Sequence, residues 1–181
     1  MWLSKATRSV LVLALAGGVF LMVDPVRGGK DPGCDPVSAT GTVFSVPVDI
    51  GPLTVCAFAG SADVFLRKQQ FVNVSVITFV LGPPRVGGDG TLHAATSHTF
   101  DFGDLGSFTT QDKAKLEPTD TPGVFRLISN LEIVSGTGIF EGARGRLAGR
   151  GGEIVLPSDA PECAGGEANW EFHGAVCLDG E

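Results

Sequence analysis

The chain has 181 residues and a mass of 18.7 kDa, which is the size of one ordinary domain. Gly supplies 26 residues and Pro 11, hydrophobic residues make up 43% and charged residues 18%. This composition excludes a fully disordered chain and a coiled coil, and the glycines lack the three-residue period of collagen. The formal net charge of −7 disfavours a nucleic-acid partner, because an acidic surface repels phosphate. We therefore expect a glycine-rich globular domain that is mostly β.

Residues 1–28 have the features of a secretory signal peptide. Lys5 and Arg8 form a positively charged start, and residues 10–23 form an apolar stretch. That stretch is shorter than the roughly 20 residues that a membrane-spanning helix needs. No A-x-A cleavage site follows it, so an uncleaved N-terminal anchor is the alternative. The segment predicts a signal helix, a secreted or otherwise extracytoplasmic protein, and no membrane contact once the signal is removed.

The four cysteines, Cys34, Cys56, Cys163 and Cys177, all follow the signal segment. Behind a signal peptide, an even number of cysteines favours disulfides. No His lies at a zinc-ligand spacing from them, so no metal is expected. Three connectivities are open. Because residues 168–178 are predicted to be extended, a bond from Cys163 to Cys177 would require the chain to double back. We favour Cys56–Cys177 with Cys34–Cys163, since the first of these bonds ties the first long strand to the last.

After an irregular lead-in expected over residues 29–40, apolar residues recur with a period of two, which is typical of β-strands. Both faces of residues 71–81 are largely apolar, so this strand is expected to be covered on both sides. The most polar stretch, residues 112–123, is expected to be an exposed loop or edge. Strands are predicted over 41–50, 53–59, 71–81, 91–102, 124–134 and 168–178, with a turn cluster over 82–90.

The later strands have one apolar and one polar face. In residues 168–178, Trp170 and Phe172 share a face, and Glu171 and His173 lie opposite. This alternation is typical of an antiparallel sheet with one solvated side. Several such strands at roughly 10–20 residue spacing predict a closed barrel or a sandwich, and a barrel also removes exposed sheet edges. We expect one such domain over residues 41–181.

Residues 134–152 form a glycine-rich run, VSGTGIFEGARGRLAGRGG. The spacing of these glycines does not match a dinucleotide fingerprint, no Gly-Lys-Ser/Thr follows, and no helix is predicted to receive a phosphate. A structural role fits better, because glycines permit tight turns. We expect Ile139 and Phe140 to plug one end of a barrel. The structural motif comprises Gly136, Gly138, Phe140, Gly142 and Gly145.

Within this run, GTGIFEGARGRL resembles the G-[ST]-G-I-F-E-G-A-x-G segment of plant allene oxide cyclases and is similar to the GGTGKFxGAxG segment of dirigent proteins. The sequence IVLP that follows, and the strand from Trp170, also fit the cyclase pattern. The resemblance is centred on residues 134–157. It implies a closed barrel of about eight antiparallel strands around an apolar cavity, commonly as a trimer. The first strands do not reproduce the family's catalytic pattern, so no catalytic residue is carried over, and Glu141 is expected to be structural.

Three functions follow from the signal segment and the resemblance. The first is a secreted barrel that binds a small apolar molecule, or a dirigent-like scaffold. The second is a cyclase or isomerase that needs no cofactor and acts by trapping a reactive conformer. The third is a filled barrel that forms oligomers through residues 71–81. A buried carboxylate or His in the cavity would favour the second function. The candidate cavity residues are Phe79, His98, Phe100, Leu127 and Phe172.

Overall fold

The computed structural model describes residues 33–178, apart from the side chains of residues 150 and 151. The signal helix predicted within residues 1–28 lies outside this range. No helix in the described range is long and apolar enough to span a bilayer. The elements are β1 (Cys34–Ile50), β2 (Leu53–Leu66), β3 (Gln69–Val80), β4 (Arg85–Val86), β5 (Leu92–Asp101), η1 (Gly103–Leu105), β6 (Ser107–Pro118), β7 (Val124–Gly136), η2 (Gly138–Phe140), β8 (Arg144–Val155) and β9 (Glu167–Cys177), where η1 and η2 are short 3-10 helices.

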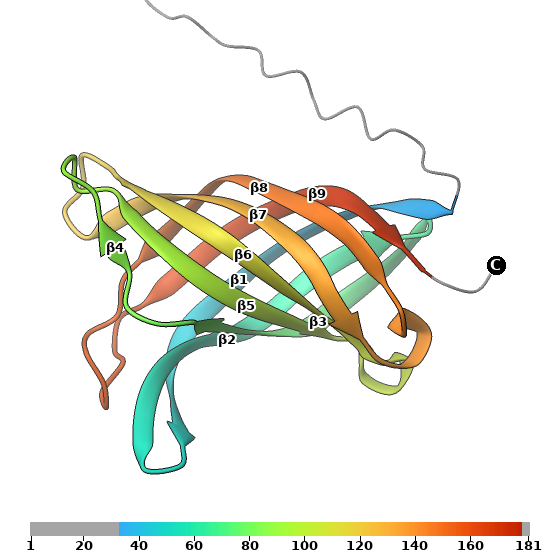
Figure 1. Ribbon diagram of the computed structural model, residues 1–181, viewed down its shortest axis with the longest axis horizontal. Helices are drawn as coiled ribbons and strands as arrows, with labels where there is room; N and C mark the ends of the chain where they lie inside the picture. The colour runs from blue at the N-terminus through green and yellow to red at the C-terminus, as the bar shows by residue number, and fades with distance from the viewer. Residues whose placement is uncertain (1–32, 179–181) are drawn as a thin grey trace, which may run out of the picture.

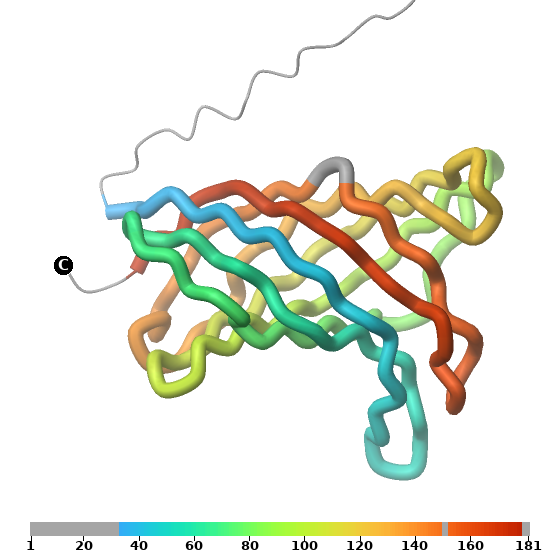
Figure 2. Tube along the Cα trace, turned by 180° about the vertical axis from the view of Figure 1, so that it is seen from behind, coloured from blue at the N-terminus to red at the C-terminus, as the bar shows by residue number. Residues whose placement is uncertain are grey.

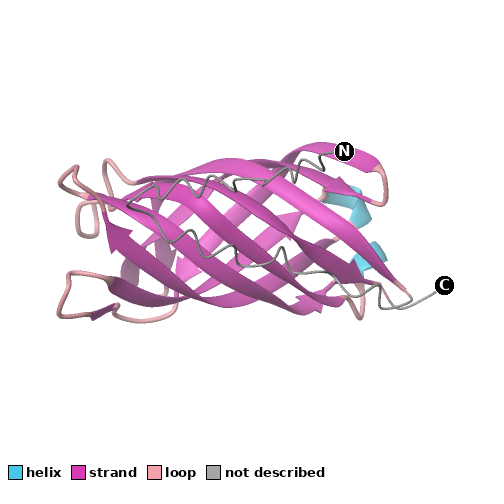
Figure 3. Cartoon of the chain, turned by 90° about the horizontal axis from the view of Figure 1, so that it is seen from above, coloured by secondary structure: helices cyan, strands magenta, loops and turns pink. Residues whose placement is uncertain are grey.

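The strands form one sheet that closes on itself (Figure 1). Neighbours pair antiparallel in the order β3-β2-β1-β9-β8-β7-β6-β5, and β3 also pairs with β5. The two-residue strand β4 pairs only with the start of β5. The eight long strands therefore form an elongated barrel, seen from above in Figure 3. The predicted all-β class and closed antiparallel barrel are confirmed, and closure leaves the barrel wall without a free edge.

Side chains along each strand point alternately into the barrel and out to solvent, as the period of two requires. On β9, Trp170 and Phe172 are buried inside, whereas Glu171 and His173 are exposed on the outer wall and hydrogen-bonded to each other. On β5, Phe100 is buried in the interior. The polar and apolar faces predicted for these two strands are therefore the outer and inner faces of the barrel.

One end of the barrel is filled by aromatic rings, and we call it the aromatic end. Phe100 and Phe108 stack with their ring centroids 4.8 Å apart. Phe140 of η2 lies on top of them, 4.6 Å from the ring of Phe102 and 5.4 Å from that of Phe108. Phe140 is fully buried, whereas half of Ile139 is exposed. Phe140 alone, and not the expected pair, therefore plugs this end.

The opposite end carries β4 and the loops over residues 119–123 and 156–166, and we call it the loop end (Figure 1). Beside it, a hairpin formed by the end of β1 and the start of β2 projects away from the barrel (Figure 2). It projects because β1 pairs with β9 only as far as Phe44, whereas its pairing with β2 continues to Ile50.

Glycines on the inner face make room for the large rings of β9. Gly41 lies opposite Trp170 in the β1–β9 ladder, and Gly149 lies opposite Phe172 in the β8–β9 ladder. A Cβ atom at either glycine would overlap the ring of its partner. The high glycine content of the chain therefore serves the packing of the barrel interior, as well as its turns.

The disulfides join Cys34 to Cys177 and Cys56 to Cys163. The connectivity favoured from the sequence is therefore wrong, although the first and last long strands are indeed joined. Cys34 and Cys177 lie directly opposite each other in the β1–β9 ladder. Cys163 lies in the loop that reaches the base of the projecting hairpin. The sequence argument failed because it placed Cys34 in an irregular lead-in rather than on a strand beside β9.

Two segment predictions are also corrected. Residues 34–40 are part of β1, and not an irregular lead-in. Pro36 is tolerated there because β1 at this point pairs with β9 and not yet with β2. Most of the stretch 112–123 belongs to β6, and only residues 119–123 form a loop. The strand was missed because its charged residues, such as Lys113, lie on the outer face of the barrel and make the stretch as a whole look polar.

Candidate functional site

A group of polar side chains lies inside the barrel, at inward-facing positions of β3, β5, β6 and β7. Burying a polar group without a hydrogen bond costs free energy, so this group calls for an explanation beyond barrel packing. The strand period of two and the register of the ladders bring the side chains together. We call them the inner polar cluster, which consists of Thr78, Thr96, His98, Thr110, Asp112 and Ser129.

Asp112 is the centre of the inner polar cluster. Its side chain is fully buried, and its two carboxylate oxygens accept hydrogen bonds from the hydroxyl groups of Thr96 and Ser129. A carboxylate has no hydrogen to donate, so the direction of both bonds is fixed. The hydroxyl hydrogens of Thr96 and Ser129 are therefore already committed to Asp112.

His98 is held by hydroxyl groups on both ring nitrogens. Its Nδ1 lies 2.8 Å from Oγ1 of Thr78, and its Nε2 lies 2.9 Å from Oγ1 of Thr96. Because Thr96 donates its hydrogen to Asp112, the oxygen of Thr96 can only accept from His98. Nε2 of His98 therefore carries a proton. Asp112 thus orients the imidazole through Thr96, and its own Oδ1 is 3.5 Å from Nε2.

Thr110 is the unsatisfied member of the inner polar cluster. Its side chain is completely buried, and its Oγ1 has no hydrogen-bond partner within the described residues. In the ladders Thr110 lies opposite His98 on one side and Ile133 on the other. The cluster therefore offers a free hydroxyl beside the imidazole.

Partly exposed apolar side chains pack against the core at both ends of the barrel, with Phe71, Phe102 and Leu178 at the aromatic end. Phe100 and Phe140 expose 1% or less of their surface, whereas Trp170 exposes 8%. The side chain of His98, although it points into the barrel, exposes 12%. Space next to His98 is therefore accessible to a water-sized molecule. Apolar residues at the rim of the loop end are also partly exposed, namely Leu92, Phe125 and Leu127.

Four of the five residues predicted for a cavity lie on the inner face. His98 belongs to the inner polar cluster, and its ring centroid is 6.3 Å from that of Phe172. Phe100 is buried and contacts Trp170 edge to face. Leu127 packs against the core from the rim of the loop end. These four side chains share the inner face, with Phe100 towards the aromatic end and Leu127 towards the loop end.

The fifth predicted residue, Phe79, is on the outer wall, because it follows the inward-facing Thr78 in β3. Its side chain is half-buried there, beside Ile77 two positions earlier. Both faces of this strand are apolar, so alternation could not identify which set faces inward.

The glycine motif shapes the aromatic end. Gly138 and Gly142 have φ angles of +61° and +72°, in the left-handed region that favours glycine. A side chain at Gly136 would overlap the backbone of Phe140. Glu141, in the same turn, is exposed and lies far from the inner polar cluster in sequence and register.

Sequence reasoning missed Asp112, Thr110 and Ser129. A pattern that could have identified Asp112 is present in DKAKL, residues 112–116, where two lysines alternate with residues that face inward. A lone aspartate among alternate lysines does not resemble a core position, because carboxylates are rarely buried unless they are paired. Its partners, Thr96 and Ser129, lie on the two adjacent strands, β5 and β7, and only the sheet register brings them to Asp112.

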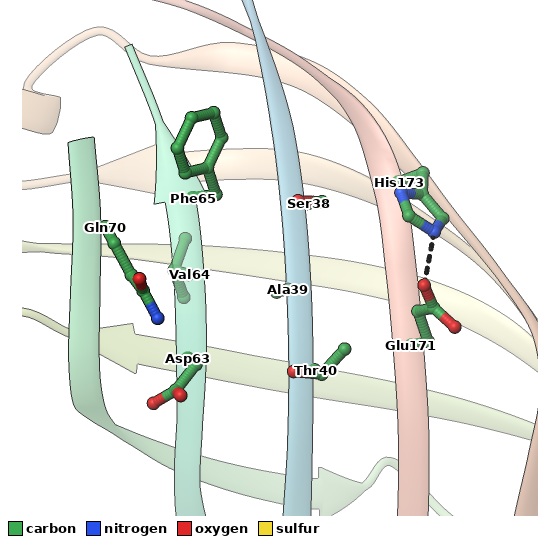
Figure 4. A pocket seen from close by; sticks show the side chains of 9 residues that line it. All are labelled: Ser38, Ala39, Thr40, Asp63, Val64, Phe65, Gln70, Glu171 and His173. Atoms are coloured by element: carbon green, nitrogen blue, oxygen red, sulfur yellow. Dashed lines mark hydrogen bonds and ion pairs between the residues drawn. The ribbon is translucent and has the colours of Figure 1, made fainter. Parts of the chain in front are cut away.

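The outer wall carries a hollow of about 290 Å³ across β9, β1, β2 and β3 (Figure 4). A neighbouring hollow of about 360 Å³ shares Thr40 and Asp63 with it. Among the residues that line the first hollow, Glu171 Oε1 and His173 Nε2 form a hydrogen bond of 2.8 Å. These polar groups can contact water, so the hollow lacks the buried, converging groups of the inner polar cluster. It is lined by Ser38, Ala39, Thr40, Asp63, Val64, Phe65, Gln70, Glu171 and His173.

Within residues 33–178, no three His, Cys, Asp or Glu side chains are placed to hold a metal ion. The chain matches no protein-family model, no curated protein and no solved structure. The resemblance of residues 134–157 to allene oxide cyclases and dirigent proteins therefore stays a prediction from the motif alone.

Proposed function

We propose that this chain is an extracytoplasmic β-barrel that binds a small, mainly apolar molecule inside its loop end, without a cofactor. The observation that carries the proposal is the partial exposure of His98, a polar side chain that points into the barrel interior. Phe140 fills the aromatic end, and space next to His98 is accessible to a water-sized molecule. A binding site of mostly apolar lining with a few convergent polar groups is typical of small-molecule pockets.

The proposed compartment is supported by the two disulfides, which form and persist in oxidising environments. The signal segment at residues 1–28 supports it as well. The motif at residues 134–157 supports a ligand-binding or dirigent-like role, and the trimer that this resemblance implies is part of the same proposal.

A second function is favoured by one specific observation, the buried Asp112 carboxylate that orients His98 inside the barrel. In many catalytic sites a third group orients the general base by hydrogen bonding in this way. In this version the barrel is a cyclase or isomerase that holds a flexible substrate in one folded conformation. Release of a rearranged product, rather than of the unchanged ligand, would distinguish this enzyme from a binding protein.

The binding proposal is tested with N-phenyl-1-naphthylamine, a neutral apolar dye whose fluorescence rises in apolar sites. We expect saturable binding by the wild-type protein. The variant Leu127→Trp should weaken it at least tenfold, because a larger ring at the rim of the loop end obstructs entry. Val134→Trp is the matched control, since Val134 lies on the same strand and is half exposed on the outside. Absence of saturable dye binding, or equal weakening by both variants, would refute the proposal.

A further inference from the structure

We infer that the ligand of the loop end carries a neutral oxygen that accepts a hydrogen bond, as in a ketone, ester or ether, and that Thr110 donates this bond. This inference rests on the proposed function and assigns the chemical class of the ligand. It starts from the unpartnered hydroxyl of Thr110, which is completely buried and faces the barrel interior.

The hydrogen atoms of the inner polar cluster can be assigned one by one. Thr96 and Ser129 donate to Asp112, and Nε2 of His98 donates to Thr96. In the tautomer with the proton on Nε2, Nδ1 accepts, and the Thr78 hydroxyl donates to it. The hydroxyl of Thr110 is then the one side-chain donor of the cluster without an acceptor, and a ligand reaches it only when the side chains packed around it move apart. A buried donor of this kind favours a ligand that supplies an acceptor.

The charge of the inner polar cluster selects against a free carboxylate on the ligand. Asp112 is fully buried, and both of its oxygens already accept hydrogen bonds from Thr96 and Ser129. A second carboxylate placed at Thr110 would lie near the first in an interior of low dielectric constant, where like charges repel strongly. A neutral oxygen accepts the same hydrogen bond without that repulsion.

The surroundings of the inner polar cluster define the rest of the ligand as apolar. Beyond the cluster, towards the loop end, inward positions hold small side chains, with Ala94 paired to Ala114 across β5 and β6, and Ala168 on β9. These residues are apolar, so they favour a hydrocarbon portion of the ligand over a polar one. A molecule with its oxygen at Thr110 would therefore extend its apolar part past these alanines towards Leu127.

The test uses 2-octanone, octane and octanoate, each displacing N-phenyl-1-naphthylamine. Thr110→Val replaces the hydroxyl with a methyl of similar volume. Because one neutral hydrogen bond is lost, it should weaken 2-octanone by about threefold to tenfold and leave octane unchanged. Octanoate should bind more weakly than 2-octanone to the wild-type protein. Thr109→Val is the matched control, since the adjacent Thr109 faces outward and bonds Thr99 there.

The outcomes separate this inference from the proposed function. If the dye binds and Thr110→Val leaves 2-octanone affinity unchanged, or if octanoate binds more tightly than 2-octanone, the assigned ligand class is wrong while the binding barrel stands. If the dye does not bind to the wild-type protein, both fail. Thr110→Val removes a hydroxyl without a partner, so we expect its denaturation midpoint to be no lower than that of the wild type.

Discussion

Gly149 has no side chain, and the ring of Phe172 occupies the space on the inner face where a Cβ atom would lie. A methyl group there would overlap the ring, and close-packed interiors tolerate added volume poorly. We predict that Gly149→Ala lowers the free energy of unfolding by about 1–3 kcal/mol, measured by chemical denaturation. Gly88→Ala is the control, because a Cβ at Gly88 meets nothing within 4 Å. Equal stability of the two variants would contradict the packing role of Gly149.

The inward or outward direction of a side chain could be predicted from the sequence for some residues and not for others. His98, Phe100 and Phe172 could be placed on an inner face because their strands alternate clearly between apolar and polar residues. Asp112 could not, since its burial depends on hydroxyl groups from β5 and β7 that no local pattern reveals. The inner polar cluster is a product of strand register, and register is a property of the closed sheet.

Among the elements, η2 has the most specific task, which is to deliver Phe140 into the aromatic end. Phe140→Ala should cost about 3–5 kcal/mol of unfolding free energy, because it removes ring contacts and leaves a cavity. Ile139→Ala tests the same turn from the exposed side and should cost much less. The measurement is the guanidinium midpoint of each variant. A similar loss at both positions would mean that the turn, and not the plug, is what matters.

Elements with one polar and one apolar face were predictable, and β5, β7 and β9 lie close to their expected ranges. The first strand was placed too late because prolines and glycines near its start resemble an irregular segment. The wrong disulfide connectivity followed from this error, since only a strand that begins at Cys34 lies opposite Cys177. Strand β6 was predicted to be a loop because its outer face is polar. The composition of a segment does not separate the outer residues from the inner ones.

At the scale of the whole molecule, the two disulfides fasten the parts that the sheet leaves least constrained. One joins the start of β1 to the end of β9 across a sequence separation of 143, and the other joins β2 to the loop before β9 across 107. In the chain-entropy model, closing loops of this length stabilises the fold by about 4–5 kcal/mol per bond. The first bond lies beside the aromatic end and the second beside the loop end.

The proposed binding site lies inside the loop end of the barrel, and not in the outer hollow of Figure 4. It is tested by amide chemical-shift mapping with NMR, in which 2-octanone is added to the wild-type protein. We expect saturable shifts concentrated at Leu92, His98 and Leu127. Shifts concentrated at Thr40 and Asp63 on the outer wall, or no saturable shifts at all, would contradict it.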